Sequence, residues 1–131
     1  MNGPGRLRRR TEFQRVYEHG VRSSGRYSTI FFLPNSLEIT RLGIAATRKL
    51  GDAVVRNRAK RLVRELFRRN PATPGFDIVV IPKADLLKAS FASLEADYRS
   101  HLARRTRPVR PPRGAADGVR REDAAAGDSR L

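Results

Sequence analysis

The sequence predicts an α+β fold, a two-layer sandwich in which helices pack on a mixed sheet in the order α-β-β-α-β-α. Three segments lead to this fold class. The run VVRNRAKRLVRELFRR at 54–69 repeats its apolar residues with the period of a helix. The stretch 27–33 is rich in β-branched and aromatic residues, which is typical of a strand. The run FDIVVIP at 76–82 is apolar on both faces, as in a central buried strand.

The first half of the chain is expected to form one helix and two strands. Thr11 is suited to cap the helix, and Gly20 is suited to end it. Turn-forming residues at 34–36 follow the strand of 27–33. A second strand is expected over 42–46, and we expect the two strands to pair as a hairpin with a loose loop.

The second half is expected to form a helix, a strand and a last helix. Asp52 is suited to cap the helix of 54–69, because its negative charge favours the positive end of the helix dipole. Pro, Gly, Asn and Thr residues at 70–75 end that helix before the strand of 76–82. The last helix is expected over 86–103, where apolar residues recur at helical spacing.

Charge is the most unusual property of the chain. It carries 28 Lys and Arg against 13 Asp and Glu, a net charge of +15. Such a charge repels itself in the folded state, so we expect a polyanionic partner. Most of the cations are arginines, whose planar forks bind phosphate and stack on bases, although genome composition explains that bias equally well.

Other classes of protein are disfavoured by composition. The chain has no cysteine, which excludes disulfides and cysteine-bound metals. No apolar run approaches the roughly 20 residues of a membrane span. The start MNGPGRLRRR lacks the apolar segment of a secretory signal. We therefore expect a soluble cytoplasmic protein with no membrane contact.

The length of 131 residues allows one domain with a modest core. We assign residues 1–10 to a basic N-terminal arm and residues 11–103 to the folded domain. Residues 104–131 have no hydrophobic periodicity and are rich in Arg, Pro and Ala, so we expect a disordered tail. A dispensable extension and an auxiliary RNA-contacting role are equally open for this tail.

No group of residues suggests catalysis by the polypeptide. The carboxylates are scattered and form no acidic cluster of the kind that holds magnesium. His19 and His101 lie far apart, and each has a structural explanation near the end of a helix. No Gly-rich phosphate loop, HExxH motif or Ser-centred elbow is present. We expect no catalytic and no metal-binding residue.

The helix predicted over 54–69 has an apolar face and a cationic face. At about 100° per residue, the apolar stripe comprises Val55, Ala59, Leu62, Val63, Leu66 and Phe67. The opposite face comprises Asn57, Lys60, Arg61, Arg64 and Arg68, with Arg56, Arg58 and Arg69 on its flanks. Glu65 is the only acid of the run, so a merely solvated surface explains this face poorly. We interpret it as a phosphate-binding surface.

Aromatic residues form a second candidate feature. Phe13 and Tyr17 share one face of the first helix, because they are four residues apart. Phe31 and Phe32 point to opposite faces of their strand. If Phe31 joins the two helical rings at the mouth of a cleft, the three could stack unpaired bases. On spacing alone, a place in the core is the better interpretation.

The stretch RLGIAATRKLGDAVVRNRAKRLVRELFR resembles the protein subunit of bacterial ribonuclease P. Its signature is the triplet Arg56-Asn57-Arg58 followed by Lys60, Arg61 and Arg64, after a strand and a Lys-Leu-Gly turn. Upstream RLRRRTEFQRVYEHGVRSSGRYSTIFF and downstream GFDIVVIPK resemble the family in order and spacing, so the resemblance covers about residues 6–102. The central motif is highly specific in this context.

The resemblance implies an enzyme in which RNA does the chemistry. The family removes the 5′ leader of precursor transfer RNA, with Mg²⁺ bound mainly by the catalytic RNA, and leaves a 5′-phosphate and a 3′-hydroxyl. It also implies a left-handed βαβ crossover around the helix of 54–69. Such crossovers are right-handed in about 98% of cases, so the spacing of the elements alone would favour the right-handed form. The expected partners are the catalytic RNA and precursor transfer RNA, with no obligate protein partner.

The resemblance also assigns residues. It implies contact with catalytic RNA for Arg56, Asn57, Arg58, Lys60, Arg61 and Arg64, to which we add Arg68 from the same face and Arg48 and Lys49 from the basic connection before the helix. It implies that Phe13, Tyr17 and Phe31 line the cleft that receives the leader, which reverses the preference for the core. Asp52 stands where the family commonly has Asn, which puts an RNA contact there in doubt.

Two other functions compete with this hypothesis. A ribosomal or ribosome-assembly protein would share the charge, the size and the lack of an active site, but the RNR context argues against it. Non-specific DNA compaction fits the charge but not the mixed α+β pattern or the aromatic residues.

Overall fold

The structure is a computed structural model and describes residues 5–106 of the chain. The elements in chain order are helix α1 (Arg10–His19), strands β1 (Val21–Ser24), β2 (Ser28–Pro34) and β3 (Arg41–Ile44), a 3-10 helix (Arg48–Leu50), helix α2 (Ala53–Arg69), strand β4 (Phe76–Pro82), a second 3-10 helix (Ala84–Lys88) and helix α3 (Phe91–Arg105). The α+β class and the mixed sheet are confirmed. The predicted tail from 107 onward lies outside the described residues.

The four strands form one sheet in the order β1-β2-β4-β3. β4 pairs with β2 in antiparallel and with β3 in parallel orientation, so it lies at the centre as predicted. The expected hairpin of β2 with β3 is wrong, because β4 lies between them and pairs with both along its two edges. β3, α2 and β4 form a βαβ unit, and the left-handed sense implied by the resemblance stays a prediction.

Strand β1 was not predicted, because its sequence VRSS is short, polar and mostly exposed.

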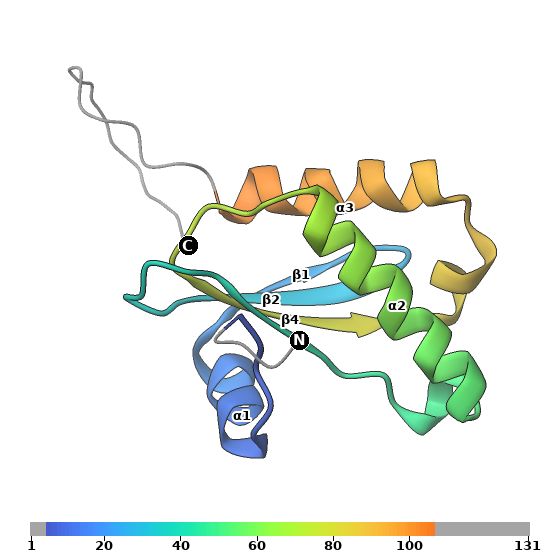
Figure 1. Ribbon diagram of the computed structural model, residues 1–131, viewed down its shortest axis with the longest axis horizontal. Coiled ribbons are helices and arrows are strands. Elements are labelled where there is room, and N and C mark those ends of the chain that lie inside the picture. Colours follow the sequence, from blue (N-terminus) through green and yellow to red (C-terminus); the bar gives the residue numbers. More distant parts are fainter. Residues whose placement is uncertain (1–4, 107–131) are drawn as a thin grey trace.

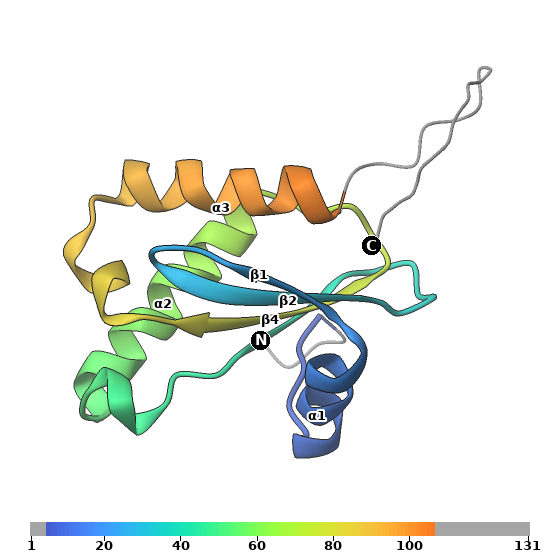
Figure 2. The same cartoon turned by 180° about the vertical axis from the view of Figure 1, so that it is seen from behind.

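Alternate residues of the central strands face two separate apolar clusters. Ile30 and Phe32 of β2 point to the face covered by α2 and α3, whereas Phe31 points to the face on which α1 packs. β4 alternates in the same way, with Ile78 on the first face and Val79 on the second. Figures 1 and 2 show α2 and α3 on one side of the sheet and α1 on the other. The larger core lies under α2 and α3.

The ends of helices α1 and α3 differ from the predictions. Helix α1 begins at Arg10 with Arg9 as its N-cap, not with Thr11. The carboxylate of Glu12 accepts hydrogen bonds from the backbone N–H groups of Arg8 (2.8 Å) and Arg9 (2.9 Å), and so satisfies donors that precede the helix. The expected last helix is divided, because the hydroxyl of Ser90 accepts from Ser93 N–H and starts α3 there. α3 ends at Arg105, beyond the predicted limit of 103.

Part of the basic N-terminal arm is an additional strand segment. Arg6 forms a parallel bridge with Leu42 at the edge of β3. Leu7 N–H donates to the Leu42 carbonyl at 3.0 Å, and Leu42 N–H donates to the Gly5 carbonyl at 2.9 Å. The Leu7 side chain is buried with Val16 and Val79. The arm therefore belongs to the folded domain from Gly5 onward.

A buried ion pair joins the arm, α1 and the sheet. Asp77 of β4 is 2% exposed, and it accepts hydrogen bonds from Arg41 Nε (2.8 Å) and Nη2 (2.7 Å) and from Asn35 Nδ2 (2.8 Å). Burial alone would raise the pKa of Asp77, but the bonds from Arg41 and Asn35 outweigh it and hold that pKa below its usual value. Arg41 Nη1 also lies 3.6 Å from Glu12, which anchors the start of α1.

A buried histidine joins α3 to β1. His101 is fully buried, its Nδ1 lies 2.6 Å from Ser23 Oγ, and its Nε2 lies 3.2 Å from Asp97 Oδ2. Burial lowers the pKa of His101, with a smaller contribution from Arg104, and the carboxylate of Asp97 opposes this only in part. The ring is therefore neutral in the folded protein at neutral pH.

We predict that Arg41→Ala lowers the free energy of unfolding by about 3 kcal/mol or more, because it leaves a buried carboxylate without its partner. Urea unfolding measures this. The matched control is Arg26→Ala, since Arg26 and its partner Asp85 are 74% and 47% exposed and such pairs contribute no more than about 1 kcal/mol. Equal losses in the two variants would contradict a special role for the buried pair.

We predict that His101 makes the protein less stable in weak acid. A depressed pKa in the folded state means that the unfolded chain binds the proton more readily, so stability falls as the pH drops below about 6.5, the ordinary value. The slope is at most about 1.4 kcal/mol per pH unit, the limit for one proton. His101→Gln should flatten this slope between pH 7.5 and pH 5 in urea unfolding. A slope that persists in His101→Gln would exclude His101 as its source.

Candidate nucleic-acid interface

Helix α2 is fixed to the sheet by its apolar stripe. Ala59, Val63 and Leu66 are buried in the larger core, and Leu62 and Phe67 pack against its edge. The stripe predicted from the helical period is confirmed. Because one side of the helix is held by the core, the opposite side keeps a fixed orientation toward solvent.

The turn that leads into α2 is defined by two residues. Gly51 has a φ of 151°, and a side chain there would lie 2.8 Å from Val55 Cγ1, so glycine is required. Asp52 caps the helix, as predicted, by accepting a hydrogen bond from Val55 N–H at 3.0 Å. Arg48 and Lys49 lie in the 3-10 helix just before this turn, and both are exposed. The predicted basic connection therefore adjoins the first turn of α2.

The predicted RNA-binding residues of α2 differ in exposure and pairing. Asn57, Arg58, Arg61 and Arg64 are exposed, and Arg56 and Lys60 are half-buried. Within residues 5–106, no ion pair joins any of these cations to a carboxylate. Arg68 differs, because its Nε donates to Glu65 at 3.1 Å and its charge is offset locally. The unpaired positive charge thus lies on the part of the helix before Glu65.

The three aromatic residues of the predicted cleft lie together. The rings of Tyr17 and Phe31 are 5.2 Å apart between centroids and meet edge to face, and those of Phe13 and Tyr17 are 6.5 Å apart. Phe13 also lies directly over Gly43 of β3, where a Cβ would be 2.7 Å from the Phe13 Cζ atom. Tyr17 is 37% exposed, and the other two rings are half-buried. We call these three rings the aromatic patch.

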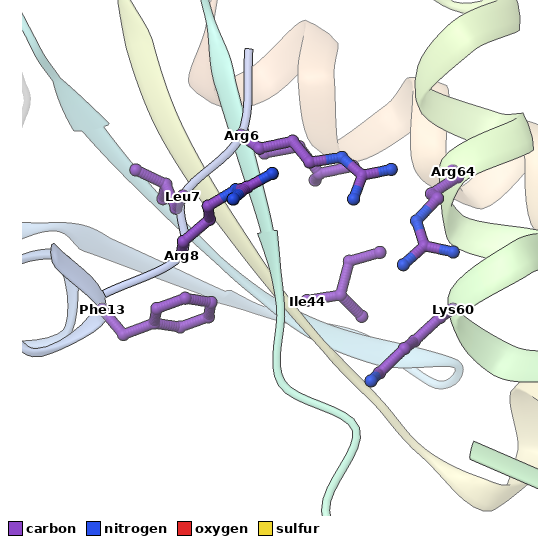
Figure 3. A pocket seen from close by; sticks show the side chains of 8 residues that line it. Arg6, Leu7, Arg8, Phe13, Ile44, Lys60 and Arg64 are labelled. Carbon is purple, nitrogen blue, oxygen red and sulfur yellow. The ribbon is translucent and has the colours of Figure 1, made fainter. Parts of the chain in front are cut away.

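A pocket lies between the N-terminal arm and α2. It has a volume of about 350 Å³, and its lining comprises Arg6, Leu7, Arg8, Phe13, Leu42, Ile44, Lys60 and Arg64 (Figure 3). Four of these eight residues are cationic, and none is acidic. Arg6 and Arg8 were not among the predicted binding residues, because only the long-range pairing of the arm with β3 brings them near α2. The basic run RLRRR was the only signal in the sequence.

The described residues do not fit a magnesium site. No three of their Asp, Glu and His side chains gather in a group that could hold a metal ion. Asp77, Glu12 and Glu95 each lie against arginine guanidinium groups, which already supply positive charge. Within the same part of the chain, no helix is long and apolar enough to cross a membrane.

The fold and the charge distribution define a small basic α+β protein whose helix α2 carries a concentrated cationic face, with no group of three possible metal ligands in the described residues. The model of the family described as Ribonuclease P matches residues 1–106. The chain therefore belongs to the ribonuclease P protein family. A member of this family is the protein component of an endoribonuclease of transfer RNA 5′ processing that also has an RNA subunit.

Individual relatives agree with this assignment. The "Ribonuclease P protein component" of Clostridioides difficile (strain 630) is 34% identical over 103 residues, which is 76% of this chain and 90% of that protein. The solved structure of the ribonuclease P protein from Thermotoga maritima has a TM-score of 0.70 at 38% identity and covers 76% of this chain and 96% of its own. The Staphylococcus aureus ribonuclease P protein has a TM-score of 0.67 at 28% identity, covering 78% of this chain and 94% of its own.

Proposed function

We propose that the chain is the protein subunit of a ribonuclease P holoenzyme that removes the 5′ leader of precursor transfer RNA in the cytoplasm. The cationic face of α2 binds the catalytic RNA, and the aromatic patch binds the single-stranded leader. The catalytic RNA and its bound Mg²⁺ carry out the hydrolysis. The polypeptide binds and orients RNA and supplies no catalytic group.

The observation that carries this proposal is the unpaired charge on α2. Arg58, Arg61 and Arg64 are exposed on a helix whose other face is fixed in the core, and no carboxylate of residues 5–106 forms an ion pair with them. Elsewhere in the domain, exposed arginines such as Arg26 and Arg69 do have acidic partners. Concentrated charge of one sign destabilises the free protein, so it is favoured where a polyanion neutralises it and releases counterions.

The aromatic patch supports the second part of the proposal. Its rings are packed well enough to hold their positions, yet Tyr17 keeps an exposed edge. Unpaired bases stack on such rings without regard to sequence. A leader whose sequence varies between precursors needs recognition of that kind, whereas a ladder of base-specific hydrogen bonds would restrict it.

Asp52 modifies the proposed RNA-binding surface. It caps α2 and brings a negative charge to the end of the helix that carries Arg56 and Arg58. Asn would cap the helix equally well without that charge. The cap is therefore retained in this chain, and we propose that RNA approaches the helix through the arginines and not through residue 52.

Reconstitution tests the proposal. Purified catalytic RNA and precursor transfer RNA are assayed at low Mg²⁺ concentration with and without the full chain. We expect the chain to increase the rate of cleavage at the correct 5′ position, because its cations reduce the repulsion between the two RNAs. An unchanged rate would contradict the proposed function.

We predict that Arg58→Ala and Arg61→Ala each weaken binding to the catalytic RNA and reduce its dependence on salt. Each lost phosphate contact should lower the slope of log K against log[salt] by about 0.9, the limit for a duplex. Arg68→Ala, at a position already paired with Glu65, should change the slope less. An unchanged salt dependence in both variants would show that Arg58 and Arg61 contact no phosphate and are only solvated surface residues.

We predict that Tyr17→Leu weakens binding of precursor transfer RNA and spares mature transfer RNA, because only the precursor has a leader to stack. One stacked base contributes about 1–3 kcal/mol, so the precursor should bind about fivefold or more weakly. Tyr27→Leu is the matched control, since Tyr27 packs against the core on the other face of the sheet. Equal losses for precursor and mature RNA with Tyr17→Leu would assign Tyr17 to folding alone.

A further inference from the structure

Gly43 of β3 lies in a row of residues on the face of the sheet that α1 covers. The strand register places Gly43 beside Val79 of β4, and Val79 beside Phe31 of β2. Val79 and Phe31 belong to the apolar cluster on the α1 side of the sheet. Directly paired residues of neighbouring strands share one face. The three positions therefore form one row beneath α1, in which only Gly43 has no side chain.

Helix α1 contacts both ends of this row. Phe13 lies over Gly43 at one end. The ring of Tyr17, one helical turn further along, meets Phe31 at the other end, with 5.2 Å between the ring centroids. Between these two contacts Val16 is fully buried. The distance of α1 from the sheet is therefore set at the same points that arrange the rings of the aromatic patch.

The position of Phe13 depends on the missing side chain of residue 43. A Cβ there would lie 2.7 Å from Cζ and 3.0 Å from Cε2 of the Phe13 ring, and 3.1 Å from Leu7 Cβ. Carbon atoms make favourable contact at about 3.5–4.0 Å. Figure 3 shows the Phe13 ring extending from α1 toward β3. The ring thus occupies the space that even an alanine at position 43 would need.

Backbone conformation does not explain this glycine. Among the described residues, the glycines with positive φ are Gly51 and Gly75, and Gly43 is not one of them. Glycine weakens a strand interior, because it has no side chain to pack and loses more conformational entropy on folding. A glycine inside the four-residue strand β3 therefore has a steric cause, and Phe13 is its nearest neighbour.

We propose that Gly43 is a positioning residue for the precursor leader, because it lets α1 approach the sheet closely enough to arrange the aromatic patch. The inference rests on the proposed function, in which this patch binds the leader. Gly43 is buried and acts through Phe13. A side chain at position 43 would push Phe13 away from β3, and the same helix carries Tyr17. The edge-to-face contact of Tyr17 with Phe31 would open, and a stacking surface for a base would be lost.

The first measurement needs no RNA. In the full chain, NMR detects the contact of Tyr17 with Phe31 as a nuclear Overhauser effect between their ring protons. We expect Gly43→Ala to weaken or remove this effect. Gly5→Ala is the matched control and should retain it, because a Cβ at Gly5 would meet no atom within 4 Å. An unchanged ring contact in Gly43→Ala would overturn the proposal.

The second measurement compares the binding of precursor and mature transfer RNA to the holoenzyme reconstituted with catalytic RNA. Gly43→Ala should bind the precursor about fivefold or more weakly, the loss expected for one stacked base. It should bind mature transfer RNA as the wild type does, because mature transfer RNA has no leader. A general defect in folding would weaken both, so equal losses would overturn the proposal, as would an unchanged affinity for the precursor.

A compensating substitution separates the steric effect from other effects of alanine at position 43. Leucine lacks the outer ring atoms that the new Cβ would meet, so Phe13→Leu should make room for it. Phe13→Leu alone should weaken precursor binding, and adding Gly43→Ala should cause no further loss. Losses that multiply would contradict a role through Phe13. If Gly43→Ala alone fails to fold, the double variant should fold in thermal unfolding experiments, and failure of both would overturn the steric explanation.

The two proposals fail in distinguishable ways. If the wild-type chain stimulates correct cleavage and Gly43→Ala discriminates precursor from mature transfer RNA equally well, the role of Gly43 is excluded and the proposed function stands. If the wild-type chain does not stimulate cleavage, the proposed function fails, and the role of Gly43 in leader binding fails with it. The ring contact measured without RNA then still decides whether Gly43 positions the aromatic patch.

Discussion

The ion pair of the buried Asp77 carboxylate is the interaction on which the arrangement of the proposed RNA-binding surface depends. It lies on the central strand, and Arg41 joins it to the neighbouring strand β3. Arg41 also reaches Glu12, which holds the backbone where the arm passes into α1. A single charged cluster thus sets the position of the aromatic patch on α1 relative to the sheet, and of Arg8 relative to the pocket. The cost of burying these charges is offset by well-formed hydrogen bonds on both oxygens of Asp77.

Arginines in this domain have two different roles that composition does not separate. Arg41 is a structural residue, because its side chain is 20% exposed and its guanidinium group is paired with carboxylates. Arg58, Arg61 and Arg64 are exposed and have no acidic partner within residues 5–106. The net charge of +15 therefore includes arginines that carboxylates of residues 5–106 offset and arginines that they do not offset. It is offset by carboxylates at Arg41, and it has no ion-pair partner among residues 5–106 at Arg58, Arg61 and Arg64 of α2.

Local sequence patterns predicted the helices and strands well. Strand pairing and the pocket depend on contacts between distant segments, which local patterns do not encode. The amphipathic period of α2 placed its apolar stripe and its cap at Asp52 correctly, because helical contacts lie within a few residues. The hairpin of β2 with β3 was wrong because strand pairing depends on which segment is most apolar, and the distant β4 displaced the nearest neighbour. Formation of the aromatic patch requires two conditions. The alternation of side chains along β2 directs Phe31 to one face of the sheet, and α1 must pack on that same face. The pocket could not be predicted, since Arg6 and Lys60 meet only through the bridge of the arm with β3. Asp77 in an otherwise apolar run was the one signal of a buried ion pair.

The docked arm has a consequence for the solubility of the free protein. Without it, β3 would expose a row of unpaired backbone groups at the edge of the sheet, which is a template for association with other chains. The backbone bonds of Gly5 and Leu7 with Leu42 cover part of that edge. Removal of the first seven residues, which include Arg6, would therefore do more than delete one cation from the pocket. It would also uncover part of the β3 edge, where another chain could pair with the free backbone groups.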